Sequence, residues 1–217
     1  MNQKAKIIIV DDHPIVRQGI AMLINREGDM HACCEASDTE QALATNQSCR
    51  HNLAIVDLSL AGSSGLELVK RLLYGFPDLR ILMMSMHDET TYAEIALRAG
   101  THGYLMKQAA TDTMLQAIRQ ILKGEIYVSD QVKARMLHKT GYGNPDQASP
   151  IKNLTPNEVE VLHLIGLGLG TSEIAGKLFR SVKTIESHRA NIKKKLNLNS
   201  GSQLAHFAIN LISSSRQ

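Results

Sequence analysis

The stretch Leu53-Ala54-Ile55-Val56-Asp57-Leu58 is an apolar run that ends in a carboxylate. A run of about six apolar residues between polar neighbours is typical of a buried parallel strand, because helices usually need ten residues or more. An ionised aspartate at such a strand end is costly unless a partner compensates it. Ligands collect beyond the carboxyl ends of parallel strands, so Asp57 is a candidate functional residue, although an aspartate in a cap or turn would give the same pattern.

Residues 1–125 contain four further apolar runs of this kind, and each is followed by a helical pattern. The predicted strands are 7–10, 30–35, 53–57, 79–84 and 103–106, and the predicted helices are 14–24, 38–47, 66–73, 89–98 and 114–122. Strands that alternate with helices in this way predict the α/β class, a doubly wound five-stranded parallel sheet with right-handed crossovers.

Polar residues stand at the ends of four of these strands, namely Asp11, Asp12, Asp57, Ser85 and Lys107. The carboxyl ends of parallel strands share one edge of the sheet, so we expect these side chains to meet. Clustered carboxylates repel one another and require a cation, and a small set of hard oxygen ligands selects Mg²⁺. Lys107 and Ser85 suit a phosphoryl group. Separate caps and surface charges would be the alternative.

The charge differs between the two halves of the 217-residue chain. Residues 1–130 carry a net charge of −4 and residues 131–217 carry +7, which together give the overall +3. A basic second half suggests a polyanionic partner. No apolar run approaches the roughly 20 residues of a membrane span, so we expect a cytoplasmic protein without a membrane partner. Three cysteines without C-x-x-C spacing indicate neither a disulfide framework nor a zinc site.

The second half begins with a predicted linker, 126–153, in which residues 130–138 are compatible with a short helix. Residues 154–217 then form a small all-α domain. Thr155-Pro156-Asn157-Glu158 combines a helix N-cap, a proline at the first helical position and a glutamate three residues after the cap. A short helix at 172–179 and a basic helix at 182–196 follow. The inward face of the basic helix is expected to hold Val182, Ile185, Ile192 and Leu196.

The first half resembles the receiver domain of bacterial two-component response regulators. The likeness rests on Val10-Asp11-Asp12-His13, Val56-Asp57-Leu58, the Ser85 strand end and Gly103-Tyr104-Leu105-Met106-Lys107. It implies a flavodoxin-like strand order 2-1-3-4-5 and a sensor histidine kinase that phosphorylates Asp57. It also implies that Asp12, Asp57 and the Ser59 backbone carbonyl ligate Mg²⁺ directly, with Asp11 acting through water. Lys107 would pair with the phosphoryl group, Ser85 would move to hydrogen-bond it, and Tyr104 would switch between exposed and buried rotamers.

The second domain resembles the LuxR-type helix-turn-helix, which with the receiver makes the NarL/FixJ class. Helix 182–196 would then enter the major groove of double-stranded DNA. The residues implied in DNA binding are Thr171, Ser172, Lys183, Thr184, Glu186, Ser187, His188, Arg189, Ala190, Lys193, Lys194 and Lys195. For any one lysine, a solvated surface charge is the alternative. The last helix, 203–212, would serve dimerisation of the active form or simply core packing.

Two positions depart from the receiver pattern. Ala61 stands where proline is usual, and Gln108 follows the lysine where many receivers have proline. We therefore keep open a DNA-binding regulator whose receiver acts independently of phosphorylation. A third possibility, an aspartyl-nucleophile phosphohydrolase, is disfavoured because Ser59 occupies the position of its general acid. The favoured function is a phosphorylation-switched transcription regulator, not a dedicated enzyme, with at most slow autodephosphorylation.

Overall fold

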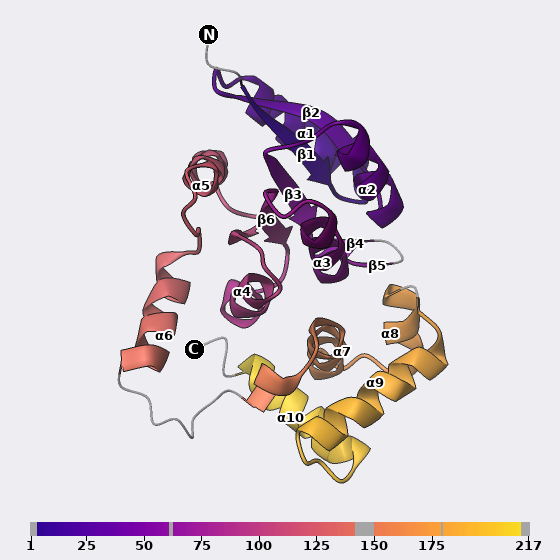
Figure 1. The fold of residues 1–217 in the computed structure, drawn as a ribbon. Helices are drawn as coiled ribbons and strands as arrows, with labels where there is room; N and C mark the ends of the chain where they lie inside the picture. Colours follow the sequence, from indigo (N-terminus) through magenta and orange to yellow (C-terminus); the bar gives the residue numbers. More distant parts are fainter. Residues whose placement is uncertain (1–3, 61–62, 142–149, 179, 214–217) are drawn as a thin grey trace. The chain divides into compact units, whose positions relative to one another are not determined.

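The computed structural model describes residues 4–60, 63–141, 150–178 and 180–213. The chain divides into two compact units, residues 1–136 and residues 137–217, and each is described by itself (Figure 1). No helix within the described ranges is both long and apolar enough to cross a membrane.

The first unit is built on a five-stranded sheet whose strand pairs are all parallel. Its strands are β1 (Ala5–Val10), β2 (Met30–Ala36), β3 (Leu53–Asp57), β6 (Arg80–Ser85) and β7 (Gly103–Met106), in the order β2-β1-β3-β6-β7. This confirms the predicted fold class and strand order. The chain changes direction across the sheet between β1 and β3, and a crevice opens at the carboxyl ends of strands at such a point.

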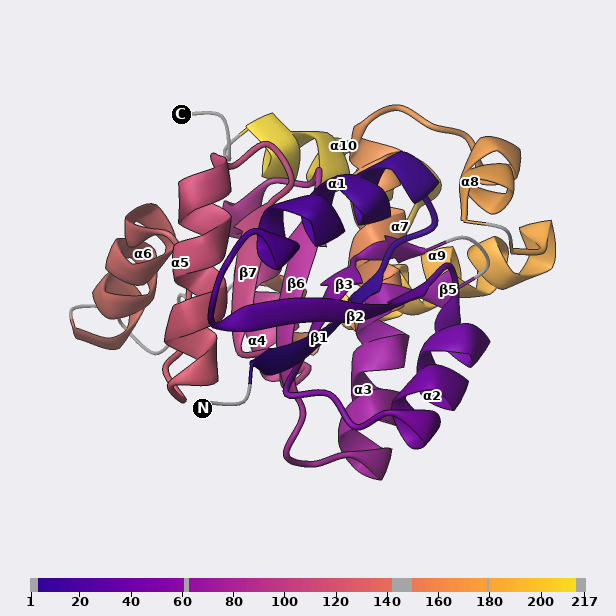
Figure 2. The same cartoon turned by 90° about the horizontal axis from the view of Figure 1, so that it is seen from above.

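Five helices cover the two faces of this sheet: α1 (Pro14–Asn25), α2 (Thr39–Ser48), α3 (Gly65–Gly75), α4 (Glu89–Arg98) and α5 (Thr111–Leu122). Helices α1 and α5 lie on one face and α2, α3 and α4 on the other (Figures 1 and 2). Side chains alternate along a strand, so Ile7 and Ile9 pack with Ile24 of α1 and Ile118 of α5. All five residues of β3 are buried, as its apolar run predicted.

A short antiparallel ladder follows β3, where only a loop was expected. Strand β4 (Ser59–Leu60) pairs with β5 (Ser63–Ser64) before α3 begins at Gly65. Gly65 lies so close to β3 that a Cβ added to it would stand 2.0 Å from the backbone oxygen of Asp57. Only glycine fits this approach. Ala61, one of the two departures from the receiver pattern, lies outside the described residues.

Residues 126–136, which the sequence suggested as part of the linker, pack in the first unit. Tyr127 forms a parallel bridge with Gly103, and its backbone oxygen accepts from the Tyr104 N–H at 3.1 Å. Val128 and Val132 are both buried. Helix α6 (Asp130–Gly141) begins directly after this bridge and extends beyond the expected residues 130–138. The chain that leaves the first unit is thus hydrogen-bonded to the strand that carries Tyr104.

The second unit is helical. A 3-10 helix, η2 (Pro150–Asn153), precedes α7 (Pro156–Gly166), α8 (Thr171–Lys177), α9 (Val182–Lys195) and α10 (Gly201–Ser213). Its core includes Leu162, Ile174, Ile185, Ile192 and Leu204. The prediction that Val182 faces inward was wrong. Val182 is 44% exposed because it is the first residue of α9, where the helix does not yet contact its packing partners. The apolar side of α10 packs against α7, which accounts for the buried Leu204 and Ala208.

Candidate functional site

Three charged side chains from three strand ends meet at the carboxyl edge of the sheet. Asp11 follows β1, Asp57 ends β3, and Lys107 follows β7. The Lys107 Nζ lies 2.6 Å from Asp11 Oδ2 and 2.8 Å from Asp57 Oδ2, and only 4% of each carboxylate side chain is exposed. The sequence prediction that these residues meet is therefore confirmed by the geometry, since one amine bridges two buried carboxylates.

Burial and charge oppose each other at Asp57. Burial raises its pKa to about 6, Asp11 adds to this rise, and the Lys107 amine and the Ser59 N–H limit it. For Lys107, burial lowers the pKa, but the two carboxylates outweigh it and leave the pKa above its usual value. The cluster thus holds one firmly protonated amine and an aspartate that is costly to ionise. A further cation at this position would lower that cost.

Asp12 and His13 complete the cluster. One ligand atom each from Asp11, Asp12, His13 and Asp57 lies within 4.8 Å of the others. The His13 Nδ1 is 2.7 Å from Asp12 Oδ1 and 3.3 Å from Asp11 Oδ1, although the imidazole is mostly exposed. Three converging carboxylates provide the hard oxygen donors that Mg²⁺ prefers, so these residues fit the predicted ion. His13 directly follows the paired aspartates, but no role was predicted for it.

Ser59 and Ser85 flank Asp57 on neighbouring segments. The Ser59 N–H donates to Asp57 Oδ1 at 3.2 Å, which holds the carboxylate in place. Ser85 is fully buried at the end of β6, and its Oγ accepts from the His87 N–H at 3.0 Å. The backbone oxygen of Ser85 also accepts from the Lys107 N–H at 2.8 Å. Ser85 is therefore tied both to the segment that leads into α4 and to the lysine of the cluster.

Tyr104 and His87 form a second layer behind these residues. The Tyr104 ring is 1% exposed, and its hydroxyl donates to the backbone oxygen of His87 at 2.9 Å. Burial raises the pKa of this hydroxyl, so it remains a donor at neutral pH. The His87 Nε2 lies 3.2 Å from Ser59 Oγ. His87 was not among the predicted site residues, and its only signal in the sequence is its position two residues after the Ser85 strand end.

A second candidate site is the exposed face of α9 in the helical unit. The predicted cap at Thr155 is confirmed: Glu158 N–H donates to Thr155 Oγ1, and Glu158 Oε2 accepts from the Thr155 N–H at 2.6 Å. The same Glu158 Oε2 accepts from Lys195 Nζ at 2.7 Å. Burial raises the pKa of Glu158, but Lys195 and Thr155 together lower it below its usual range. One buried carboxylate therefore joins the start of α7 to the end of α9.

Ser181 caps α9 as predicted, since its Oγ accepts from the Thr184 N–H at 3.1 Å. The residues expected to contact DNA divide by exposure. Those exposed are Ser172, Lys183, Glu186, Ser187, Ala190, Lys194 and Lys195, and those half-buried are Thr171, Thr184, His188, Arg189 and Lys193. The amine of Lys195 is already engaged with Glu158, which sets it apart from Lys194.

A parallel sheet with carboxylates at its strand ends, followed by a helix-turn-helix unit, defines a regulator that joins a receiver to a DNA-binding domain. Residues 7–119 match the family described as response regulator receiver domain, and residues 152–208 match bacterial regulatory proteins, luxR family. The chain therefore belongs to the response regulators with a LuxR-type DNA-binding domain, the NarL/FixJ class of two-component transcription regulators.

Relatives resemble the chain over nearly its whole length. The oxygen regulatory protein NreC of Staphylococcus carnosus (strain TM300) is 35% identical, over 94% of this chain and 96% of NreC. NreC of Staphylococcus aureus (strain JH9) is 37% identical with the same coverage. A solved structure of RcsB from Salmonella enterica serovar Typhimurium, bound to promoter rprA with the phosphomimetic BeF3-, is 28% identical with a TM-score of 0.65 and covers 95% of this chain and 98% of RcsB.

Proposed function

We propose that Asp57 is the phosphorylated residue of this regulator and that its modification, by a sensor histidine kinase, controls dimerisation and DNA binding by α9. The observation that carries this proposal is the bridge from Lys107 Nζ to Asp11 and Asp57, because it places a buried carboxylate beside a fixed positive charge. A phosphohydrolase would need an acid at position 59, where Ser59 stands.

In the proposed reaction, a carboxylate oxygen of Asp57 attacks the phosphorus of a phosphohistidine. The new O–P bond makes an acyl phosphate, the P–N bond breaks, and the histidine of the kinase keeps the electron pair. Mg²⁺, held by Asp11, Asp12, Asp57 and the Ser59 carbonyl, would offset the charge of the phosphoryl oxygens. Lys107 would transfer its hydrogen bond from the Asp57 carboxylate to the phosphoryl group.

Ser85 would connect the phosphorylation of Asp57 to a movement of neighbouring residues. A phosphoryl group on Asp57 carries about two negative charges in place of the one on the carboxylate, and it adds strong acceptors. The Ser85 hydroxyl accepts from the His87 N–H and still has its own hydrogen to donate to these acceptors, and a rotation of its side chain toward Asp57 would disturb the His87 contact. His87 also holds the Tyr104 hydroxyl through its backbone oxygen. A movement of Ser85 would therefore disturb the hydrogen bonds of both His87 and Tyr104. These contacts connect Asp57 to the surface around α4.

We propose that the exposed side of α9 reads DNA in the major groove. Lys183 and Lys194 would contact phosphates, while Glu186, Ser187 and Ala190 would face base edges. Two solved RcsB structures, bound to promoters in the presence of BeF3-, support a link between modification and DNA binding, and a further structure holds two RcsB dimers bound to two parallel DNAs. A chromosomal target would place the protein in the cytoplasm.

The test uses the full-length chain with acetyl phosphate or beryllium fluoride, with and without Mg²⁺. We expect Mg²⁺-dependent modification of Asp57, followed by an increase in molar mass and in DNA affinity. Asp57→Asn should abolish all three effects, whereas the control Asp78→Asn, at an exposed position, should change none. Slow return of the modified protein would measure autodephosphorylation. Modification without any change in dimerisation or DNA affinity would instead support a receiver that acts independently of phosphorylation.

A further inference from the structure

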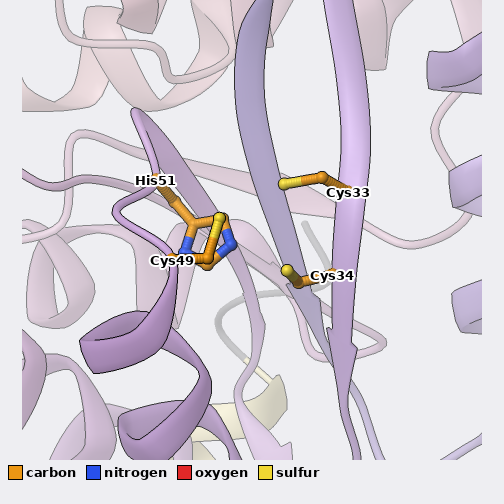
Figure 3. A group of neighbouring side chains, drawn as sticks. All are labelled: Cys33, Cys34, Cys49 and His51. Atoms are coloured by element: carbon orange, nitrogen blue, oxygen red, sulfur yellow. The ribbon is translucent and has the colours of Figure 1, made fainter.

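Cys33, Cys34, Cys49 and His51 gather on the face of the first unit that α2 covers (Figure 3). Each offers one sulfur or nitrogen atom, and these four atoms lie within 4.8 Å of one another. The three cysteines are free thiols and partly exposed, so solutes can reach them. The spacing of these residues in the sequence gave no sign of a site, and the phosphorylation chemistry makes no use of them.

A bulge in β2 explains how adjacent cysteines reach the same place. Residues that follow each other on a strand normally point to opposite faces. Here Ile7 pairs with Ala32 and Ile8 pairs with Cys34, so Cys33 is an extra residue without a partner in the register. Such a bulge interrupts the alternation of side chains. Figure 3 shows the sulfurs of Cys33 and Cys34 on the same side of the strand, facing Cys49 and His51.

His51 is fixed in a form suited to bind a metal. It is 8% exposed, and its Nδ1 lies 2.6 Å from the Oδ1 of the buried Asn46. The amide oxygen can only accept, so Nδ1 carries the proton and Nε2 keeps a lone pair. Nε2 is buried and has no hydrogen-bond partner among the described residues.

We propose that Cys33, Cys34, Cys49 and His51 bind one Zn²⁺ tetrahedrally, separately from the carboxylate cluster around Asp57. Thiolates and a neutral imidazole are the donors that zinc prefers, whereas Mg²⁺ prefers oxygen. Zinc–sulfur bonds of about 2.3 Å place the sulfurs of a tetrahedral site about 3.8 Å apart. The present spacing needs a contraction of about an ångström at most. The three thiols release their protons to solvent when the zinc–sulfur bonds form.

Asn46 is the positioning residue of this site. A ligand histidine usually donates its second ring N–H to an oxygen, which orients the ring and fixes its tautomer. The contact between His51 Nδ1 and Asn46 Oδ1 has this arrangement, and Asn46 is only 1% exposed. Because the ligands come from β2, the residue that ends α2 and the turn before β3, bound zinc would join three neighbouring segments of the first unit.

The test uses the reduced, metal-stripped full chain in millimolar Mg²⁺, which keeps the carboxylate cluster occupied. Zn²⁺ is titrated against a chromogenic chelator, and Co²⁺ serves as a spectroscopic probe. We expect one Zn²⁺ per chain, and a Co²⁺ complex with the intense thiolate-to-metal band and visible bands of a tetrahedral site. Zinc should also protect the three thiols from a maleimide, a measurement that needs no variant.

Variants then assign the ligands. Cys34→Ser, Cys49→Ser and His51→Gln should each weaken zinc binding by more than about 100-fold, and Asn46→Ala by about 10- to 100-fold, as for other residues that orient a ligand. His31→Gln is the matched control, because His31 is exposed on the same strand and contacts Asn25 instead. The proposal is overturned if the unsubstituted chain shows no thiolate band with Co²⁺, if its thiols form a disulfide without taking up zinc, or if His51→Gln binds zinc as tightly as His31→Gln.

Discussion

The amine of Lys107 lies 2.8 Å from Asp57 Oδ2 and 2.6 Å from Asp11 Oδ2, where it balances two buried carboxylates. A divalent cation at the same carboxylates must share them with this charge. We therefore predict that Lys107→Ala binds Mg²⁺ several-fold more tightly, as measured by calorimetry, while it loses the response to acetyl phosphate. The control Lys123→Ala removes an exposed charge from the same unit and should change neither property. Equal Mg²⁺ affinity in both variants would show that the Lys107 amine and Mg²⁺ do not compete for the two carboxylates.

Asp57→Asn should stabilise the metal-free protein at neutral pH. Burial raises the pKa of Asp57 from 3.8 to about 6 in the folded protein. Between these values the folded state binds more protons than the unfolded state, so stability falls as pH rises through this interval. The variant lacks the ionisation that causes this fall, so it should gain about 3 kcal/mol at pH 7, at about 1.4 kcal/mol per pKa unit over this interval. Urea unfolding in EDTA across this pH range measures it, and saturating Mg²⁺ should reduce the difference.

Gly65→Ala should destabilise the first unit strongly. Its new Cβ would stand 2.0 Å from the backbone oxygen of Asp57, so either β3 or the start of α3 must move. We expect a loss of about 3 kcal/mol or more in the free energy of unfolding, as for other severe backbone clashes. Gly75→Ala, at the end of the same helix, meets nothing within 4 Å and should be neutral or stabilising by up to about 1 kcal/mol. Similar unfolding midpoints for the two variants would refute this close approach.

Substitution of Lys194 should weaken DNA binding, whereas substitution of the neighbouring Lys195 should lower the stability of the second unit. Lys194 is exposed, so Lys194→Ala should lower affinity for all DNA sequences and reduce the salt slope by about one, with stability unchanged. Lys195 Nζ holds the buried Glu158 at 2.7 Å, so Lys195→Ala should cost the second unit on the order of 1 kcal/mol. Salt-dependent DNA titrations and thermal unfolding of both variants check this. A sequence-selective loss in Lys194→Ala would contradict its assignment to a phosphate.

The sequence was informative where a local rule decides the structure. Apolar runs identified the five strands, and the shared edge of a parallel sheet then placed Asp11, Asp57 and Lys107 together. The caps at Thr155 and Ser181 followed from residue type and spacing within one helical turn. In each case the partners are either a few residues apart or brought together by the regular geometry of the sheet.

Other features depend on contacts that no local rule describes. The hydrogen bond from Tyr104 to the His87 backbone joins strand β7 to the irregular segment between β6 and α4, and periodicity carries no information about such a contact. The cysteine cluster was missed because strict alternation would place Cys33 and Cys34 on opposite faces, and the bulge that overrides it depends on the pairing with β1. Val182 was misjudged because helical spacing gives its face but not where the neighbouring helices end.

The bulge at Cys33 lies on a strand at the outer edge of the sheet, since β2 pairs with β1 on one side and with none of the described strands on the other. Regular edge strands are templates on which a second molecule can add a strand, and this addition leads to aggregation. The extra residue Cys33 interrupts the regular spacing of the backbone donors and acceptors of β2. A strand that pairs with one end of β2 therefore cannot stay in register with its other end. The irregularity that collects the cysteines therefore also protects the sheet from being extended by another copy of the chain.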